Sequence, residues 1–125
     1  PLRWDDTGKP AVDADGVYVS VSHSGPYAVC AVADVPVGVD VEVVRSADEK
    51  FMRRVCSEAE MAYIRVGDDG DCARFWEIWT AKESLFKLTG KGPLLTLSQL
   101  ALPEGVVLDH IREKGCALTT ALRLR

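Results

Sequence analysis

The sequence lacks any long apolar run and any excess of positive charge. No stretch approaches the roughly 18–20 consecutive apolar residues of a membrane-spanning helix, and no signal segment opens the chain. Its 15 lysines and arginines are outnumbered by 19 aspartates and glutamates, which gives a formal net charge of -4. This balance argues against a nucleic-acid-binding protein, because such a protein needs a basic face for phosphate contacts. We therefore expect neither a membrane nor a nucleic-acid partner, although a local cationic pocket for a small anion is compatible with the charge.

Cysteine and histidine are also scarce, and their spacing predicts no zinc site. The four cysteines show no CxxC pattern, and there are only two histidines. We interpret the cysteines as reduced residues of a cytoplasmic protein, where they serve mainly as small core side chains. The first residue is Pro1 rather than Met, so we expect the start to be processed or to be a boundary within a longer polypeptide.

Alternating and continuous apolar patterns predict three strands in the first part of the chain. The 125 residues are enough for one domain, 1–125, with a modest core. Residues 16–24 alternate at period two, 27–35 form a continuous apolar run, and 37–44 alternate again. We expect the apolar run to be a central strand covered on both faces. The short turns favour an antiparallel meander of these three strands, preceded by a loop over residues 1–15.

The period changes after Ser46, where the sequence predicts helices. A short helix is expected first, and Ser57 with Glu60 forms a capping box that opens a second helix. The longest helix is expected over 71–89. Two further strands near the C-terminus are expected to meet at a turn around Lys114 and Gly115. Together these elements predict an α+β domain in which an antiparallel sheet packs against the long helix.

Two acidic residues share one face of the third predicted strand. Val39, Val41 and Val43 point to one side, whereas Asp40 and Glu42 point to the other, about 6.6–7 Å apart along the strand. They could simply face water on a solvated edge. The apolar strand before them argues for burial, and buried carboxylates repel one another unless a cation joins them. A hard divalent ion such as Mg²⁺ would suit them.

The long predicted helix carries charged residues within its apolar arc. Phe75, Trp79 and Phe86 cluster at helical spacing with Trp76 at the edge, while Arg74, Glu77, Thr80 and Ser84 occupy the opposite arc, which we expect to face water. Lys82 and Glu83 project within about 40° of the centre of the apolar cluster. Lys82 could lay its stem along apolar surface, and Glu83 could pair with Lys87. Alternatively, a carboxylate flanked by two lysines suits a metal and a phosphate together.

The ordered motifs resemble those of a known enzyme family. They are "GKP" at 8–10, "VSVSHSG" at 19–25, "GVDVE" at 38–42, "CSEAE" at 56–60 and "WTAKESLFKLTGKG" at 79–92. Their order and residues resemble the 4′-phosphopantetheinyl transferases, and in particular the surfactin-synthetase-activating type, in which an SHS strand precedes the GVDVE strand. The resemblance covers residues 8–92 well and the C-terminal strands by position only.

The resemblance implies an activity and a set of site residues. That family moves the phosphopantetheine arm of coenzyme A, its substrate, onto a serine of an acyl or peptidyl carrier protein and releases 3′,5′-ADP with the help of Mg²⁺. By the same resemblance, the metal carboxylates would be Asp40, Glu42 and Glu83, and the catalytic residues would be Glu60 as general base and Lys87 at the leaving phosphate. The coenzyme-binding residues would be Lys9, Ser22, His23, Lys82 and Lys91, and Trp79 would belong to the core.

Two of these binding residues carry open alternatives. His23 shares strand parity with Val17, Val19 and Val21, so it could be a buried histidine bonded to backbone. Ser22 would then point the other way. Lys91 stands between two glycines, which permit a close backbone approach to a ligand, but glycine after a helix is also an ordinary cap.

The chain departs from the family in its length. Family members with the SHS strand carry an extra half before it, whereas only about 37 residues precede "GVDVE" here. We therefore expect one of three arrangements. The chain forms a homo-oligomer that rebuilds the coenzyme cleft, it pairs with a different chain, or it is a fragment of a longer protein. Two rival functions are a non-catalytic protein of this fold that binds coenzyme A or a carrier protein, and a generic Mg²⁺–nucleotide-binding domain.

Overall fold

The computed structural model describes residues 2–4, 6, 9–12, 14–67, 72–90, 100–113 and 115–125. In the described residues, five strands are followed by three helices and two further strands, an α+β arrangement that confirms the predicted fold class. The elements are β1 Leu2–Trp4, β2 Pro10–Val12, β3 Tyr18–Ser24, β4 Tyr27–Ala33, β5 Val37–Val43, α1 Glu49–Val55, α2 Glu58–Val66, α3 Ala73–Thr89, β6 Val106–Glu113 and β7 Cys116–Arg123. Within these ranges, no helix is both long enough and apolar enough to cross a membrane.

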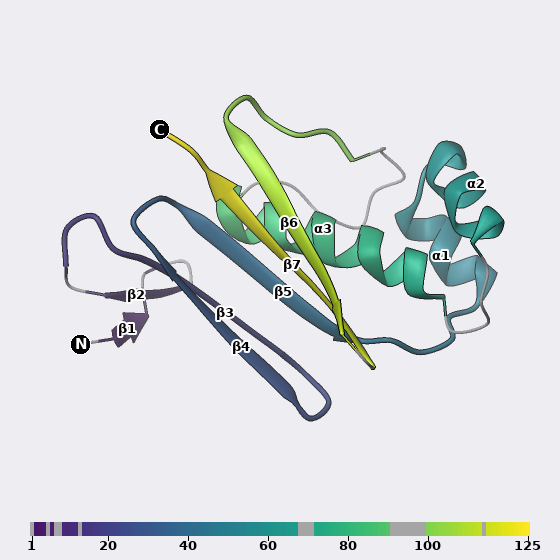
Figure 1. Ribbon diagram of the computed structural model, residues 1–125, viewed down its shortest axis with the longest axis horizontal. Coiled ribbons are helices and arrows are strands. Elements are labelled where there is room, and N and C mark those ends of the chain that lie inside the picture. The colour runs from purple at the N-terminus through teal and green to yellow at the C-terminus, as the bar shows by residue number, and fades with distance from the viewer. Residues whose placement is uncertain are drawn as a thin grey trace.

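The strands form three antiparallel groups rather than one meander. Their hydrogen-bonded orders are β1–β2, β3–β4 and β5–β7–β6. Figure 1 shows α3 lying across one face of the β5–β7–β6 sheet, with α1 and α2 near one end of the helix and the β3–β4 hairpin beside β5. The predicted meander is confirmed for β3 and β4, which pair antiparallel, but it is wrong for β5, whose ladder is formed with β7 from the far end of the chain. The predicted loop over residues 1–15 is also wrong in part, since β1 and β2 pair there.

The apolar strand β4 lies at an edge and is not covered on both faces, contrary to expectation. Its partner is β3, and its residues Ala28, Cys30 and Val32 are exposed. Val32 retains 66% of its accessible surface. A continuous apolar run therefore does not mark a central strand here.

A glycine allows α3 to pack directly on β5. A Cβ atom at Gly38 would lie 2.1 Å from the carbonyl oxygen of Ser84 and 2.7 Å from the backbone nitrogen of Leu88. Such distances are far below van der Waals contact, so any other side chain would push the helix away from the strand. The close approach brings the acidic residues of β5 beside the C-terminal half of α3.

The helix α3 is buried on two sides, which corrects the expectation that Thr80 and Ser84 face water. Both side chains have 0% relative exposure, and Thr80 Oγ1 lies 2.7 Å from Oγ1 of Thr119 in β7. Toward its N-terminal end, Phe75 and Trp76 join a core that includes residues of α1 and α2 and Ala117 of β7. The helix therefore lies between the sheet and the shorter helices, which explains why its polar residues are small where the sheet covers them.

The helix ends agree with the sequence signals. Ser57 and Glu60 form the predicted reciprocal capping box at the start of α2. At the end of α3, Gly90 adopts a left-handed conformation with φ 68°, and its N–H donates to the carbonyl of Phe86.

Candidate active site

One cavity gathers five of the predicted site residues. It has a volume of about 400 Å³ and is bordered by β1, β2, β3, β5 and the end of α3. The predicted residues that line it are Lys9, Ser22, His23, Asp40 and Lys87. They come from β3, β5, α3 and the residue just before β2, so the fold rather than the local sequence brings them together.

Asp40 is the buried carboxylate of this cavity. Its relative exposure is 5%, and its Oδ1 atom accepts hydrogen bonds from Ser22 Oγ at 3.0 Å and from Lys87 Nζ at 3.2 Å. Within the described part of the chain, Oδ2 is buried and has no hydrogen-bond partner. Burial raises the pKa of Asp40 to about 6, although the nearby charge of Lys87 opposes the shift. Because no described residue donates a hydrogen bond to Oδ2 of Asp40, this oxygen could bind a cation.

Lys87 bridges β3 and β5. Its Nζ donates to the carbonyl oxygen of Val21 at 3.3 Å and to that of Val39 at 3.1 Å, in addition to its bond with Asp40. The ammonium of Lys9 in turn contacts the carbonyl of Lys87. A lysine in this position keeps positive charge between the two strands, next to the cavity.

Glu42 and Glu83 complete the predicted set of carboxylates. Glu42 accepts from Ser24 Oγ at 3.1 Å and from Trp79 Nε1 at 3.1 Å, and Arg45 lies 3.5 Å from it. Burial raises the pKa of Glu83 to about 7, and the charges of Asp40 and Glu42 add to this effect. The three carboxylates therefore lie close enough to influence one another electrostatically.

These carboxylates fit a hard cation in their chemistry. Among the residues that the structure describes, no three acidic, histidine or cysteine side chains form a ready-made metal cluster. Mg²⁺, however, usually takes only one or two protein carboxylates and completes its shell with water and phosphate oxygens. The buried, unpartnered Oδ2 of Asp40 is the feature that fits such an ion best.

Glu60 and Lys82 form a second group, held together by a buried ion pair. Lys82 Nζ lies 2.8 Å from Glu60 Oε1 and donates to the carbonyl of Val55 at 2.6 Å. Glu60 also accepts from the N–H groups of Ser57 at 2.8 Å and Leu100 at 2.9 Å. Burial raises the pKa of Glu60, but the bonds from Lys82 and the two N–H groups outweigh it and lower the pKa below 4.5. Lys82 is only 6% exposed, so its ammonium does not reach water along an apolar surface.

His23 and Ser22 lie on opposite faces of β3, yet both line the cavity. His23 is exposed, so the alternative of a buried histidine is wrong. Ser22 is buried. Lys91 lies outside the described residues.

Sequence reasoning missed four residues around the site. Trp4 and Ser20 line the cavity, while Ser24 and Trp79 bind Glu42. The alternation of serines in "SVSHS" could have indicated Ser20 and Ser24, because it matches the alternation of acids in "GVDVE". Trp4 could not have been found, since it lies in a segment predicted to be loop.

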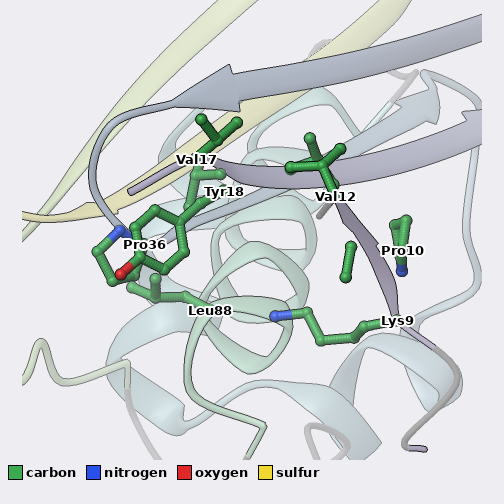
Figure 2. Close-up of a pocket in the computed structure, with 10 residues that line it drawn as sticks. Lys9, Pro10, Val12, Val17, Tyr18, Pro36 and Leu88 are labelled. Atoms are coloured by element: carbon green, nitrogen blue, oxygen red, sulfur yellow. The ribbon is translucent and has the colours of Figure 1, made fainter. Parts of the chain in front are cut away.

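A second cavity, of about 360 Å³, adjoins the first through Lys9, which lines both. Figure 2 shows the Lys9 side chain extending toward Leu88, with Val12, Val17 and Tyr18 on other sides of the cavity. Of the predicted site residues, it contains only Lys9 among its described lining. The first cavity therefore holds five of the predicted site residues. Among its described lining residues it does not include Glu42, Glu83, Glu60 or Lys82.

Comparison with known proteins identifies the family of this chain. Residues 36–111 match the family model of the 4′-phosphopantetheinyl transferase superfamily. The chain is 34% identical over 98 residues to the 4′-phosphopantetheinyl transferase gsp of Aneurinibacillus migulanus, covering 78% of this chain and 41% of that protein. It is 31% identical over 97 residues to the 4′-phosphopantetheinyl transferase Sfp of Bacillus subtilis (strain 168), covering 76% and 43%. The corresponding enzyme psf-1 of Bacillus pumilus is 36% identical over 93 residues, with coverage of 73% and 40%.

The chain thus belongs to the 4′-phosphopantetheinyl transferase superfamily, as its motifs predicted. It spans less than half the length of these relatives.

Proposed function

We propose that this chain carries the metal- and coenzyme-binding part of a Mg²⁺-dependent 4′-phosphopantetheinyl transferase. The proposed reaction moves the phosphopantetheine arm of coenzyme A to a serine of an acyl or peptidyl carrier protein and releases 3′,5′-ADP. The observation that carries the proposal is the single cavity lined by Lys9, Ser22, His23, Asp40 and Lys87. These residues place positive charge beside an open carboxylate oxygen, which suits a pyrophosphate bound together with a cation.

The proposed reaction needs charge neutralisation more than covalent help. The carrier serine oxygen attacks the phosphorus that bears the pantetheine arm, and the bond to the 3′,5′-ADP oxygen breaks. The serine proton passes to a base, while the leaving phosphate gains negative charge. Lys87 would exchange one carbonyl partner for this phosphate and stabilise its charge. Lys9 and His23 would bind the remaining phosphates.

The carboxylates would hold the cation. Asp40 would offer its open Oδ2, and Glu42 and Glu83 would complete the acidic side of the site. When bound, Mg²⁺ would orient the pyrophosphate and lower the charge barrier between it and the incoming serine.

The roles of Glu60 and Lys82 stay predictions of the resemblance. Glu60 would accept the serine proton and Lys82 would contact the pyrophosphate, so their buried ion pair would have to open first. A carboxylate whose pKa lies below 4.5 is ionised at neutral pH but is a weak base. Their paired arrangement favours a role in holding the helices together, and the Glu60→Gln variant distinguishes this role from that of a general base.

The proposal is tested by intact-mass measurement of an apo-carrier protein mixed with this chain, coenzyme A and Mg²⁺. We expect a mass gain equal to one phosphopantetheinyl group, which a chelator and Asp40→Asn both abolish. Binding of coenzyme A without any mass gain would instead establish the alternative, a non-catalytic coenzyme- or carrier-binding domain.

A further inference from the structure

Three alternate serines of β3 bind the backbone of β5. The Oγ atoms of Ser20, Ser22 and Ser24 accept from the N–H groups of Val39, Val41 and Val43 at 3.0, 3.2 and 3.0 Å, respectively. Both residue numbers rise together, so the two strands run in the same direction. Because β3 and β5 belong to separate hydrogen-bonded sheets, serine oxygens here take the place that backbone carbonyls hold in a ladder.

Two of the three serines also bind a carboxylate. A serine hydroxyl has one donor and two acceptor sites, so accepting an N–H leaves its own hydrogen free. Ser22 donates this hydrogen to Asp40 Oδ1 at 3.0 Å, and Ser24 donates to Glu42 Oε1 at 3.1 Å. Each of these serines therefore binds two consecutive residues of β5. It accepts from the N–H group of one valine and donates to the carboxylate of the residue that precedes this valine.

Ser20 provides an internal comparison. It accepts from Val39 like its neighbours, but the residue before Val39 is Gly38, which has no side chain. The glycine is required there because α3 packs against it. Ser20 thus shares the strand-joining bond of the other serines without a carboxylate partner on β5.

The bonds to Asp40 fall on one oxygen. Ser22 and Lys87 both donate to Oδ1, while Oδ2 is left without a partner among the described residues. On Glu42, Ser24 holds Oε1 while Trp79 holds Oε2. These bonds fix the direction in which each carboxylate points.

We propose that Ser22 and Ser24 are positioning residues that orient Asp40 and Glu42 to receive the divalent cation. The inference rests on the proposed function, because it presumes that these carboxylates hold a metal. It gives Ser22 a role through Asp40, in addition to the contact with coenzyme that the resemblance implies. Groups that hydrogen-bond to metal ligands typically change metal affinity about 10–100-fold when they are removed.

Mg²⁺ titration calorimetry without coenzyme tests the inference on the folded chain. We expect Ser22→Ala and Ser24→Ala to weaken Mg²⁺ binding by about tenfold, and Ser24→Thr, which keeps the hydroxyl, to restore it. Ser20→Ala is the matched control and should bind Mg²⁺ as the wild type does. Equal affinity in the wild type and both alanine variants would overturn the inference, as would an equal loss in Ser20→Ala.

A metal-free measurement separates this inference from the proposed function. In a double-mutant cycle of chemical unfolding, Ser22→Ala and Asp40→Asn should be non-additive, whereas Ser20→Ala and Asp40→Asn should be additive. Additivity of the first pair would show that the hydroxyl does not hold the carboxylate and would overturn the inference. A wild-type chain that shows the expected coupling but binds no Mg²⁺ would contradict the proposed metal site itself, and the positioning role with it.

Discussion

Lys87 places one positive charge among three oxygens, two of them backbone carbonyls. Carbonyl partners are neutral, so the ammonium keeps most of its charge available for an anion that enters the cavity. This makes Lys87 more than a counter-ion of Asp40. Its position between β3 and β5 is fixed from both strands.

We expect Lys87→Ala to lower the turnover number by about 100-fold or more, because the lost charge matters most as the leaving phosphate develops its own. Binding of coenzyme A should stay detectable. Single-turnover kinetics with an apo-carrier, compared with coenzyme titration, separates the two effects. An unchanged turnover number would rule out this role for Lys87.

Asp40→Asn should remove Mg²⁺ binding without unfolding the protein. The carboxylate is buried with one unpartnered oxygen, so the folded chain gains little from its negative charge, and an amide of the same size fills the space. Calorimetric Mg²⁺ titration and chemical unfolding measure the two effects. The same binding isotherm for variant and wild type would contradict the assignment.

At the scale of elements, the Glu60–Lys82 pair ties the helices together. Glu60 lies in α2, Lys82 lies in α3, and the pair also holds the last residue of α1 and the backbone of Leu100. Removing one partner of a buried pair costs about 3–5 kcal/mol, because it leaves the other charge unpaired. Glu60→Ala should therefore lower the free energy of unfolding by about this amount.

The pair should also make stability depend on pH. The pKa of Glu60 is lowered below 4.5 in the folded protein, so its stabilising effect is complete well above 4.5. The effect is lost as the pH falls from 4.5 through the folded pKa. Chemical unfolding between neutral and acidic pH should show a steeper loss for the wild type than for Glu60→Gln.

Glu58→Gln is the control for this measurement, since Glu58 is an exposed acid two residues away on the same helix, and it should follow the wild type. If Glu60→Gln instead leaves stability and its pH dependence unchanged while abolishing transfer, Glu60 acts as the general base.

Local patterns predicted the elements better than their partners. The capping box at Ser57 and the glycine at position 90 are local signals, and both mark the observed helix ends. The pairing of β5 with β7 joins residues far apart in the sequence, and no period of either strand encodes it. Burial of Thr80 likewise depends on Thr119, which local spacing could not indicate.

The same limit applies to the site. Asp40 and Lys87 were predicted together because both belong to motifs of the family, and they bind one another in the structure. Lys82 is only five residues from Lys87, but it turns toward α1 and α2 instead of the cavity. Helical spacing correctly predicted that Lys82 lies in the apolar arc, but it could not predict that Lys82 pairs with Glu60 there.

At the scale of the molecule, the β3–β4 hairpin exposes apolar side chains on one face. Among the described residues of this face, Cys30 and Val32 of β4 are exposed, and they lie opposite Val21, which lines the cavity, and the buried Val19. The homo-oligomer expected from the sequence would place a second copy of the chain on this face, where it would supply the other wall of the coenzyme cleft.

Analytical ultracentrifugation with and without coenzyme A and Mg²⁺ tests this assembly. We expect a dimer that the coenzyme strengthens, because ligand that binds only the assembled cleft favours it by mass action. Val32→Asp, on the exposed face, should weaken the dimer, whereas Val66→Asp, on the exposed side of α2, should not. A strict monomer that still modifies a carrier protein would show that one wall is enough.

The serine bonds between β3 and β5 have a consequence for motion. In the described strands, no backbone ladder crosses this boundary, so the hairpin can separate from β5 while both sheets stay intact. Rotation of a serine side chain costs far less free energy than the opening of a backbone hydrogen-bond ladder. The amide protons of Val39, Val41 and Val43 therefore report on this boundary in hydrogen exchange, separately from the unfolding of either sheet. Ser22, Asp40 and Lys87 lie along the boundary between β3 and β5, and all three line the cavity. We therefore expect the small fluctuation that exposes those amides also to open the cavity between the two strands.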